Sequence, residues 1–256
     1  GAFVGTAAVA IFAVAINLEG IYMHFSTAIA GVFLPKVTAM VTRNNNSKEI
    51  SDLFIRTGRI QYIVIAMILA GFVAFGRDFI ILWAGPDYES AYPITMLFFV
   101  SLAIPLIQNL GITILQARNQ MKFRSLLYIV IASFSLVFQI ILAKPLGGLG
   151  CAIAIAGALF LGQGLIMNVY YQKKQHLDII YFWKEILKMS IVPIIVCICS
   201  MGILYNIELD SWSSFGLAVI IFVLVYVPLF YHFSMNQSER DLFVKPIVSI
   251  IHKFKR

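Results

Sequence analysis

The side chains best suited to chemistry lie near the start of the sequence, within the apolar run Ala10–Leu34. Glu19 is the one carboxylate in that run, and Asn17 and His24 lie on either side of it. Because burying an ionisable group at membrane depth is costly, such a group is a candidate for contact with a substrate or an ion. A carboxylate can hydrogen-bond sugar hydroxyls or bind a cation. We therefore predict that Asn17, Glu19 and His24 line a path for a transported molecule.

The helical pattern of this run divides it into an apolar side and a polar side. At 100° per residue, one face holds Ile21, Phe25, Ala28, Ile29 and Val32, and the other holds Glu19, Gly20, His24, Ser26, Thr27 and Gly31. A side of polar and small residues is typical of a helix that borders a cavity, and equally of a helix that packs tightly against others. In the second case Glu19 lies near the outer membrane interface, and both interpretations stay open.

Further polar groups interrupt the later apolar runs. They are Gln108, Asn109, Gln139, Gln163 and Asn168. We assign Gln108 and Asn109 to the predicted path, although a helix–helix hydrogen bond is the alternative for each amide. Pro105 lies in the middle of the same run and frees a backbone carbonyl, which predicts a kink of the kind at which transporters bend.

The motifs expected of an enzyme are absent from the sequence. It has no glycine-rich nucleotide loop, no His-Glu-x-x-His zinc motif and no Gly-x-Ser-x-Gly nucleophile elbow. The four histidines are scattered, and the three cysteines, Cys151, Cys197 and Cys199, are interpreted as packing residues. We therefore expect no catalytic residue, no metal and no cofactor, and the pattern favours transport.

The composition requires a membrane to cover most of the chain. Hydrophobic residues make up 61% of the 256 residues and charged residues 12%, with a mean hydropathy of +0.90. Apolar runs of the length that crosses a hydrocarbon core of about 30 Å predict seven helical spans. They are Ala10–Leu34, Ile60–Gly76, Pro93–Leu115, Ser125–Leu142, Gly148–Tyr170, Met189–Tyr205 and Phe215–Tyr231. The polar residues Asn17, Glu19 and Gly20 are the place where the first span would break.

The placement of charge supports this count independently. All but two of the 19 basic residues fall in every second loop or in the C-terminal tail, and the exceptions are Arg77 and Lys144. Basic loops stay in the cytoplasm, so we expect a cytoplasmic C-terminus. The net charge of +7 then reports topology, and nucleic acid is not an expected partner. Lys36, Arg118 and Arg124 stand at the inner mouth of the spans, where they either meet an anionic headgroup or only anchor the topology.

Seven spans that end inside place residue 1 outside, yet the sequence begins Gly-Ala-Phe-Val-Gly with no initiator Met and no charged signal peptide. We therefore expect residues 1–9 to end a preceding transmembrane helix, in a C-terminal portion of a longer protein. Two segments have the pattern of interfacial helices. One is cytoplasmic, 171–188, and the other is the amphipathic cytoplasmic tail 233–256, in which Ser238 and Asp241 fit a capping box.

Several short motifs follow one another in an order that resembles a known family. They are residues 1–12, Phe33-Leu34-Pro35-Lys36-Val37, residues 76–91, Leu115-Gln116-Ala117-Arg118-Asn119-Gln120 and Pro145-Leu146-Gly147-Gly148-Leu149-Gly150. In these motifs the chain resembles the C-terminal half of polysaccharide flippases of the multidrug/oligosaccharidyl-lipid/polysaccharide exporter superfamily, in particular the O-antigen and capsule repeat-unit translocases. The resemblance extends over nearly the whole chain.

The resemblance implies an all-α fold, a polytopic helical membrane protein that forms one lobe of a MATE-like, inverted-V transporter with alternating access. On that basis residues 10–170 are the C-terminal six-helix lobe, with five full spans, and residues 189–232 are two additional transmembrane helices. The implied cargo is an undecaprenyl-pyrophosphate-linked oligosaccharide, moved across the bacterial cytoplasmic (inner) membrane. Membrane lipid is then a partner, and a coupling cation and other polysaccharide-assembly proteins are further candidates.

One departure from that expectation concerns the pyrophosphate. A dianion in a medium of low dielectric constant needs paired positive charge, yet no basic residue lies in the middle of a predicted span. A deep cationic site is therefore expected from the half of the protein that precedes this chain. Three other functions stay open: a cation-coupled exporter of organic cations that uses Glu19, a membrane glycan polymerase or acyltransferase with outside catalytic loops, and a structural subunit.

Overall fold

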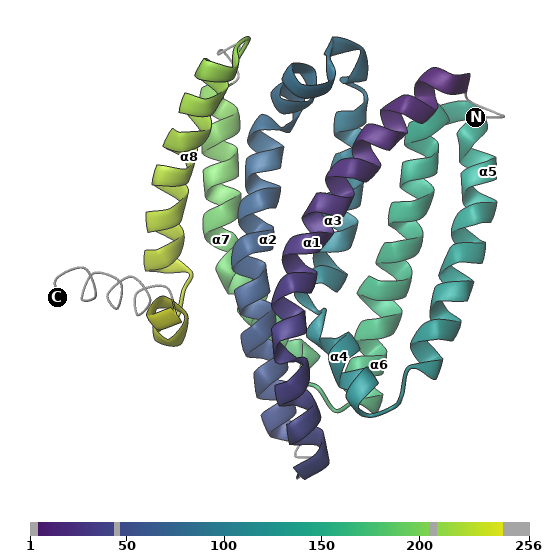
Figure 1. Ribbon diagram of the computed structural model, residues 1–256, viewed down its shortest axis with the longest axis vertical. Helices are drawn as coiled ribbons and strands as arrows, with labels where there is room; N and C mark the ends of the chain where they lie inside the picture. Colours follow the sequence, from purple (N-terminus) through teal and green to yellow (C-terminus); the bar gives the residue numbers. More distant parts are fainter. Residues whose placement is uncertain (1–4, 44–46, 205–208, 243–256) are drawn as a thin grey trace.

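The computed structural model describes residues 5–43, 47–204 and 209–242, and every regular element in these ranges is helical. The elements are α1 (Gly5–Arg43), α2 (Ser47–Ala84), the 3₁₀ turn η1 (Pro86–Tyr88), α3 (Ala91–Ile107), α4 (Leu110–Ala117), α5 (Lys122–Leu159), the π-helix η2 (Phe160–Ile166), α6 (Met167–Lys174), α7 (Ile179–Leu204) and α8 (Trp212–Phe233). They form a bundle of long helices that run alongside one another (Figure 1).

Most of these helices are long and apolar enough to cross a membrane. The stretches that qualify among the described residues are Gly5–Ala28, Ser47–Ala84, Lys122–Lys174, Ile179–Leu204 and Trp212–Phe233, and the bent pair α3–α4 makes a sixth. The chain is therefore a multi-pass helical membrane protein, as the composition predicts. Lipid must cover these helices, because their outer faces expose large apolar side chains along most of their length.

The longest stretch, Lys122–Lys174, crosses twice because it folds back on itself within α5. Gly147 has φ 58° and ψ −135°, a conformation that side chains disfavour, and Pro145 precedes it. Figure 1 shows the two limbs side by side. They correspond to the predicted spans Ser125–Leu142 and Gly148–Tyr170.

The third predicted span is bent between α3 and α4. The two helices meet at 44° across a break at Gln108 and Asn109, three residues beyond the Pro105 at which the sequence predicts a kink. Proline removes one backbone donor and disturbs the ladder of hydrogen bonds in the turns beside it. The bend is therefore confirmed, and it leaves carbonyl groups of the last turn of α3 free to accept side-chain donors.

Other boundaries differ from the expected ones. α1 continues unbroken past Asn17, Glu19 and Gly20 and also contains Pro35. Residues 1–4 lie outside the described residues, and 5–9 form the first turns of α1 itself. The sequence interpretation placed boundaries at polar residues, whereas a long helix tolerates isolated polar residues when its other faces pack well.

The two segments interpreted as interfacial are also arranged differently. In 171–188, the part from Ile179 onward already belongs to α7 and is continuous with the following span. Most of the tail lies outside the described residues. Its first turn is capped by Asn236, whose Oδ1 accepts from the Glu239 backbone N–H at 2.9 Å while Glu239 Oε2 accepts from the Asn236 N–H at 2.9 Å. The predicted Ser238 cap was therefore wrong by two residues.

The two ends of the bundle differ in charge. The end of α1, the start of α2, α4, the start of α5 and α6 gather at one end, and the start of α3 and the fold-back in α5 lie at the other (Figure 1). The basic loops predicted to be cytoplasmic therefore share one end of the molecule. At the opposite end Arg77 is neutralised by Glu89, with Nε and Oε1 2.7 Å apart.

Aromatic contacts hold the centre of the bundle together. Tyr22 of α1 stacks on Phe99 of α3 with ring centroids 4.2 Å apart, and Phe54 of α2 packs against Phe182 of α7 at 5.1 Å. Buried aromatic pairs add about 0.5–1.5 kcal/mol each beyond the area that they cover. These contacts attach α1 to α3 and α2 to α7.

Candidate functional site

The polar residues of α1 lie on two different faces. Asn17, His24 and Gly31 follow one another every seven residues, or about two turns, and all three are exposed. Glu19 and Ser26 are also seven residues apart, but Glu19 is half-buried and Ser26 is fully buried. The predicted common face for Glu19, His24 and Ser26 was therefore wrong, because five residues separate Glu19 from His24, which places them about 140° apart around the helix axis. Ser26 faces α3.

The exposed stripe on α1, formed by Asn17, His24, Thr27, Ala28 and Gly31, differs from the other exposed faces of the bundle. Elsewhere these faces are strongly apolar; on α5 they include Leu126, Ile129, Val130, Phe134, Leu136, Val137, Ile140 and Ile141. Apolar surface is suited to lipid, whereas amide, imidazole and hydroxyl groups lose their hydrogen bonds in it. The stripe is thus a surface for water, a polar ligand or tightly packed protein.

Glu19 has a different environment from the stripe. Its side chain is partly buried on the inward half of α1, between the buried residues Leu18 and Tyr22 along the helix. Within the part of the chain that the structure describes, the Glu19 carboxylate belongs to none of the ion pairs. A carboxylate in this position can bind a cation or accept hydrogen bonds from hydroxyl groups.

The bend between α3 and α4 is satisfied by side chains from α1 and α2. Ser26 Oγ donates to the Leu106 carbonyl at 2.6 Å. The amide of Gln61, oriented with its nitrogen toward α3, donates to the Ile107 carbonyl at 3.0 Å and to the Leu106 carbonyl at 3.2 Å. Asn109 Nδ2 donates to Ser26 Oγ at 3.4 Å. These bonds compensate the carbonyl groups that the broken helix leaves free.

Gln108 joins a second buried network on the other side of the bend. Its Nε2 donates to Asn168 Oδ1 at 2.7 Å, and the same oxygen accepts from Trp183 Nε1 at 2.9 Å. Asn168 Nδ2 donates back to the Gly164 carbonyl at 2.6 Å. Both Gln108 and Asn109 are therefore buried and hydrogen-bonded between helices, as in the helix-packing alternative, and neither lies on the exposed stripe of α1.

The three inner-mouth basic residues have different partners. Arg118 Nη1 donates to the Gln175 carbonyl at 3.0 Å and to its side-chain oxygen at 2.9 Å, and burial lowers the pKa of Arg118 from its usual value. Arg124 Nη2 donates to the Tyr128 hydroxyl at 2.6 Å. Lys36 alone of the three is exposed. It is thus the one best placed to meet an anionic headgroup.

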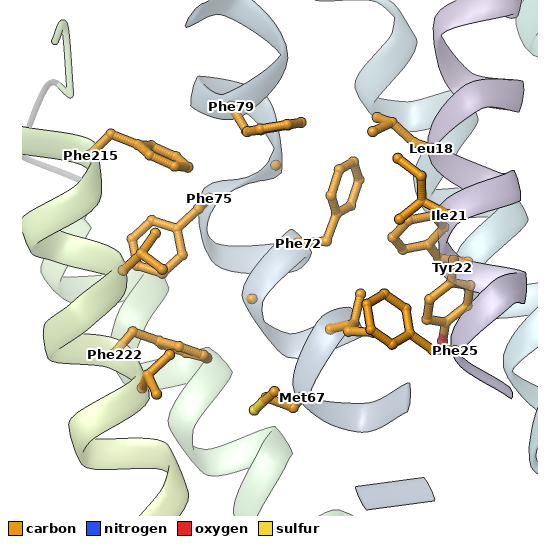
Figure 2. Close-up of a pocket in the computed structure, with 16 residues that line it drawn as sticks. Leu18, Ile21, Tyr22, Phe25, Met67, Phe72, Phe75, Phe79, Phe215 and Phe222 are labelled. Carbon is orange, nitrogen blue, oxygen red and sulfur yellow. The ribbon is translucent and has the colours of Figure 1, made fainter. Parts of the chain in front are cut away.

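An apolar groove lies beside the stripe, between α1, α2 and α8 (Figure 2). Its volume is about 370 Å³. The aromatic residues of its walls are Tyr22, Phe25, Phe72, Phe75, Phe79, Phe99, Phe215 and Phe222. Figure 2 shows the rings of α2 between those of α1 and α8. A groove of this chemistry is suited to a hydrocarbon chain and offers almost nothing to a polar ligand.

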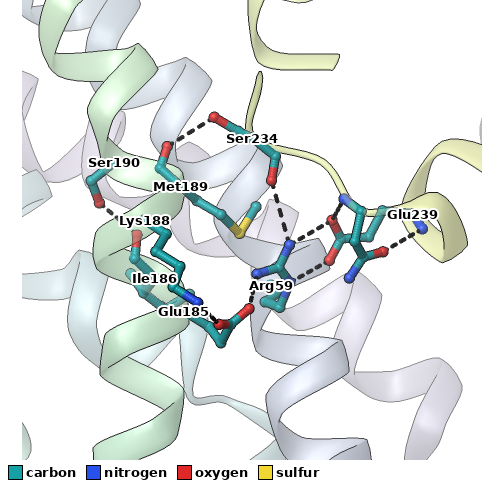
Figure 3. A network of polar contacts seen from close by, with 9 residues as sticks. Arg59, Glu185, Ile186, Lys188, Met189, Ser190, Ser234 and Glu239 are labelled. Atoms are coloured by element: carbon teal, nitrogen blue, oxygen red, sulfur yellow. Dashed lines mark hydrogen bonds and ion pairs between the residues drawn. The ribbon is translucent and has the colours of Figure 1, made fainter. Parts of the chain in front are cut away.

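A buried ion cluster, which sequence reasoning missed, joins α2, α7 and the segment after α8 (Figure 3). Arg59 Nε lies 2.6 Å from Glu239 Oε1, and Arg59 Nη1 lies 2.7 Å from Glu185 Oε2. Lys188 adds a 2.7 Å contact to Glu185. The sequence places Arg59 with the loop cations, and no local signal connects it to carboxylates 126 and 180 residues away.

The described residues contain no group of three or more His, Cys, Asp and Glu side chains that could hold a metal ion. All three cysteines are free thiols.

Comparison with known proteins relates the chain to one membrane protein. It is 20% identical over 247 residues to the uncharacterized membrane protein EpsK of Bacillus subtilis (strain 168). The match covers 94% of the chain and 48% of EpsK, so the chain spans about half the length of this relative. No protein family and no solved structure matches the chain. The relative supports the multi-pass membrane character that the helices indicate.

Proposed function

We propose that the chain is part of a transporter that moves a lipid-linked oligosaccharide across the bacterial cytoplasmic membrane for surface polysaccharide synthesis. The resemblance of its motifs to polysaccharide flippases and its membrane-spanning helices support this proposal. Such a transporter needs no covalent chemistry; it must offer a polar route for the sugar and an apolar one for the lipid. The whole protein's cargo, its cytoplasmic C-terminus and its membrane all belong to the proposal.

The observation that carries the proposal is that α1 separates two surfaces of opposite chemistry. Asn17 and His24 lie on its polar stripe, whereas Ile21 and Phe25, in the adjoining turns, line the aromatic groove. A lipid-linked oligosaccharide likewise has a polar part, the sugar, and an apolar part, the isoprenoid chain. Hydroxyl groups of the sugar can bond the amide and imidazole of the stripe, while the isoprenoid chain stays in apolar surroundings.

Lys36 is the residue of this chain that we assign to the anionic headgroup. It is exposed near the end of α1 on the side where the basic loops gather. A lysine at a membrane interface attracts phosphate without the cost of burying a charge in the bilayer. Lys36 would therefore bind the anionic headgroup at the membrane interface. Deeper in the membrane, this chain offers neutral hydrogen-bond donors along the proposed path.

The test uses the full-length gene in a strain that makes a surface polysaccharide and carries a single copy of the gene. Deletion should abolish surface polysaccharide, and the intact gene should restore it. Gly71→Leu should restore it poorly, because Gly71 lines the groove and the new side chain would occupy it. The matched control is Gly216→Leu on α8, where an added Cβ meets no atom within 4 Å and which does not line the groove. Normal polysaccharide after deletion would refute the proposal.

A second function on the same fold is the export of organic cations. The observation that favours it is the half-buried Glu19, which belongs to no ion pair in the described part of the chain. A carboxylate in a membrane helix attracts cations strongly because little water screens it. Drug susceptibility of cells expressing Glu19→Gln distinguishes the two functions: an exporter loses resistance, whereas a strain with unchanged susceptibility and normal polysaccharide excludes this role for Glu19.

A further inference from the structure

A crevice between the start of α5 and the end of α6 has apolar walls and lysines at one end. Its volume is about 350 Å³, and it is lined by Phe123, Leu165, Val169, Tyr170, Lys173 and Lys174, among others. The Phe123 and Tyr170 rings stack with centroids 4.1 Å apart and close one wall. The crevice is separate from the groove and the stripe described above, since none of its residues belongs to either of them.

The residues of η2 and α6 are arranged in two rows that end in positive charge. One row is Leu165, Val169 and Lys173, and the other is Ile166, Tyr170 and Lys174, each with a spacing of four residues. Residues four apart lie on the same side of a helix, so each row runs about 12 Å along the helix axis from apolar residues to a lysine. This order, apolar residues followed by a positive charge, matches that of a phospholipid, in which an acyl chain is followed by a phosphate.

The residues that line the crevice include two lysines and no carboxylate. Between Glu89 and Asp178 the sequence contains no Asp or Glu. Lys173 and Lys174 are exposed and belong to no ion pair among the described residues. Lys122 begins α5 directly before Phe123 and adds a third cation. The lysines lie at the end of the bundle where the basic loops gather, which is the side of the cytoplasmic leaflet in the proposed topology.

We propose that this crevice is a binding site for an anionic phospholipid of the cytoplasmic leaflet. One acyl chain lies against Leu165 and Val169, and the phosphate lies between Lys173 and Lys174. Lysines in the last turn of α6 also stabilise the negative end of its dipole, a role that needs no lipid. The apolar rows that lead to them are what distinguishes a lipid site from helix capping alone. The site does not depend on which molecule the protein transports.

The experiment is native mass spectrometry of the purified full-length protein, titrated with phosphatidylglycerol or phosphatidylcholine. We expect the first bound phosphatidylglycerol to be retained more tightly than phosphatidylcholine. The variant Lys173→Gln/Lys174→Gln should weaken phosphatidylglycerol binding by about 25-fold, since each lysine near an anionic lipid contributes roughly a factor of five. Lys173→Arg/Lys174→Arg should restore it. The matched control, Lys144→Gln/Lys184→Gln, removes two exposed lysines from elsewhere and should change nothing.

A second variant distinguishes binding in the crevice from a general attraction of anionic lipid to positive charge on the surface. Leu165→Trp keeps both lysines but fills the apolar rows, and it should weaken phosphatidylglycerol binding while thermal unfolding shows that the protein remains folded. Unchanged binding in this variant or in the double glutamine variant would overturn the proposal. Equal retention of the two phospholipids would overturn it as well. If undecaprenyl phosphate displaced phosphatidylglycerol at equal concentration, the site would belong to the substrate carrier and the phospholipid assignment would be wrong.

Discussion

Arg59 and Glu239 are 180 residues apart in the sequence and are joined by two hydrogen bonds, Nε to Oε1 at 2.6 Å and Nη2 to Oε2 at 3.0 Å. Glu239 is 1% exposed, and the Arg59 side chain is 6% exposed. The pair fastens the segment that follows α8 onto α2 at the basic end of the bundle. Glu185 of α7 shares the same guanidinium, so three separate parts of the chain depend on one cation.

Removing one partner of this buried pair should destabilise the protein strongly. Glu239→Gln leaves Arg59 with a buried charge and only Glu185 to neutralise it, which typically costs about 3–5 kcal/mol. Thermal unfolding in detergent measures the loss as a fall in Tm. Arg77→Gln is the control, because the Arg77–Glu89 pair is similarly short, at 2.7 Å against 2.6 Å for Arg59–Glu239, but its side chains are 59% and 49% exposed. Exposed pairs contribute about 0–1 kcal/mol. Equal falls in Tm would contradict the role of burial.

Gly58 should tolerate no side chain. A Cβ at this position would lie 2.8 Å from the Ile107 carbonyl oxygen and would also overlap the Phe182 ring. Gly58→Ala should therefore lower Tm by pushing α2 away from α3. Gly202→Ala on α7 is the control, since nothing lies within 4 Å of the new methyl group and alanine favours a helix by about 1 kcal/mol. The two substitutions should shift Tm in opposite directions, and a shared direction would argue against the close approach of the helices.

Asn168 should be the most sensitive amide of the bundle. Asn168→Ala removes the acceptor for both Gln108 and Trp183 and leaves two buried donors without it, at a cost of about 1–3 kcal/mol for each unsatisfied group. Gln139→Ala is the comparison, because Gln139 is half-buried and donates only to Ser135. The loss of stability is measured as a fall in Tm. The altered environment of Trp183 is measured as a shift in the wavelength of tryptophan fluorescence emission. A smaller effect at Asn168 than at Gln139 would contradict the network.

The exposed stripe on α1 should be accessible to water in the complete protein. In a full-length background without native cysteines, Asn17→Cys and His24→Cys should react with a membrane-impermeant maleimide from at least one side of the membrane. Leu136→Cys, on an apolar exposed face of α5, should not react because lipid covers it. Absence of labelling at both stripe positions from either side would show that the stripe is a packing surface, and the translocation path would lose its support from this chain.

Much of the architecture could be predicted from local composition. The multi-pass helical character was confirmed, and the basic loops gather at one end of the bundle, because the hydrophobicity of a run of about 20 residues and the charge of its flanks are properties of neighbouring residues. The bend near Pro105 was predicted for the same local reason. The boundaries of the helices were predicted less well, because α1 and α7 continue through segments at which the composition predicts a break.

The roles of individual polar residues could not be derived in this way. Glu19 and His24 are equally suitable for a path by residue type, yet the structure turns one inward and leaves the other exposed. By its position in the sequence Arg59 is grouped with the basic residues of the loops, yet it is the centre of a buried ion cluster. Composition and the positions of the charged residues are enough to predict that the chain crosses a membrane repeatedly and which loops carry positive charge. Which polar groups meet depends on the folded bundle, because the rotation of each helix about its axis is set by packing against helices that lie far away in the chain.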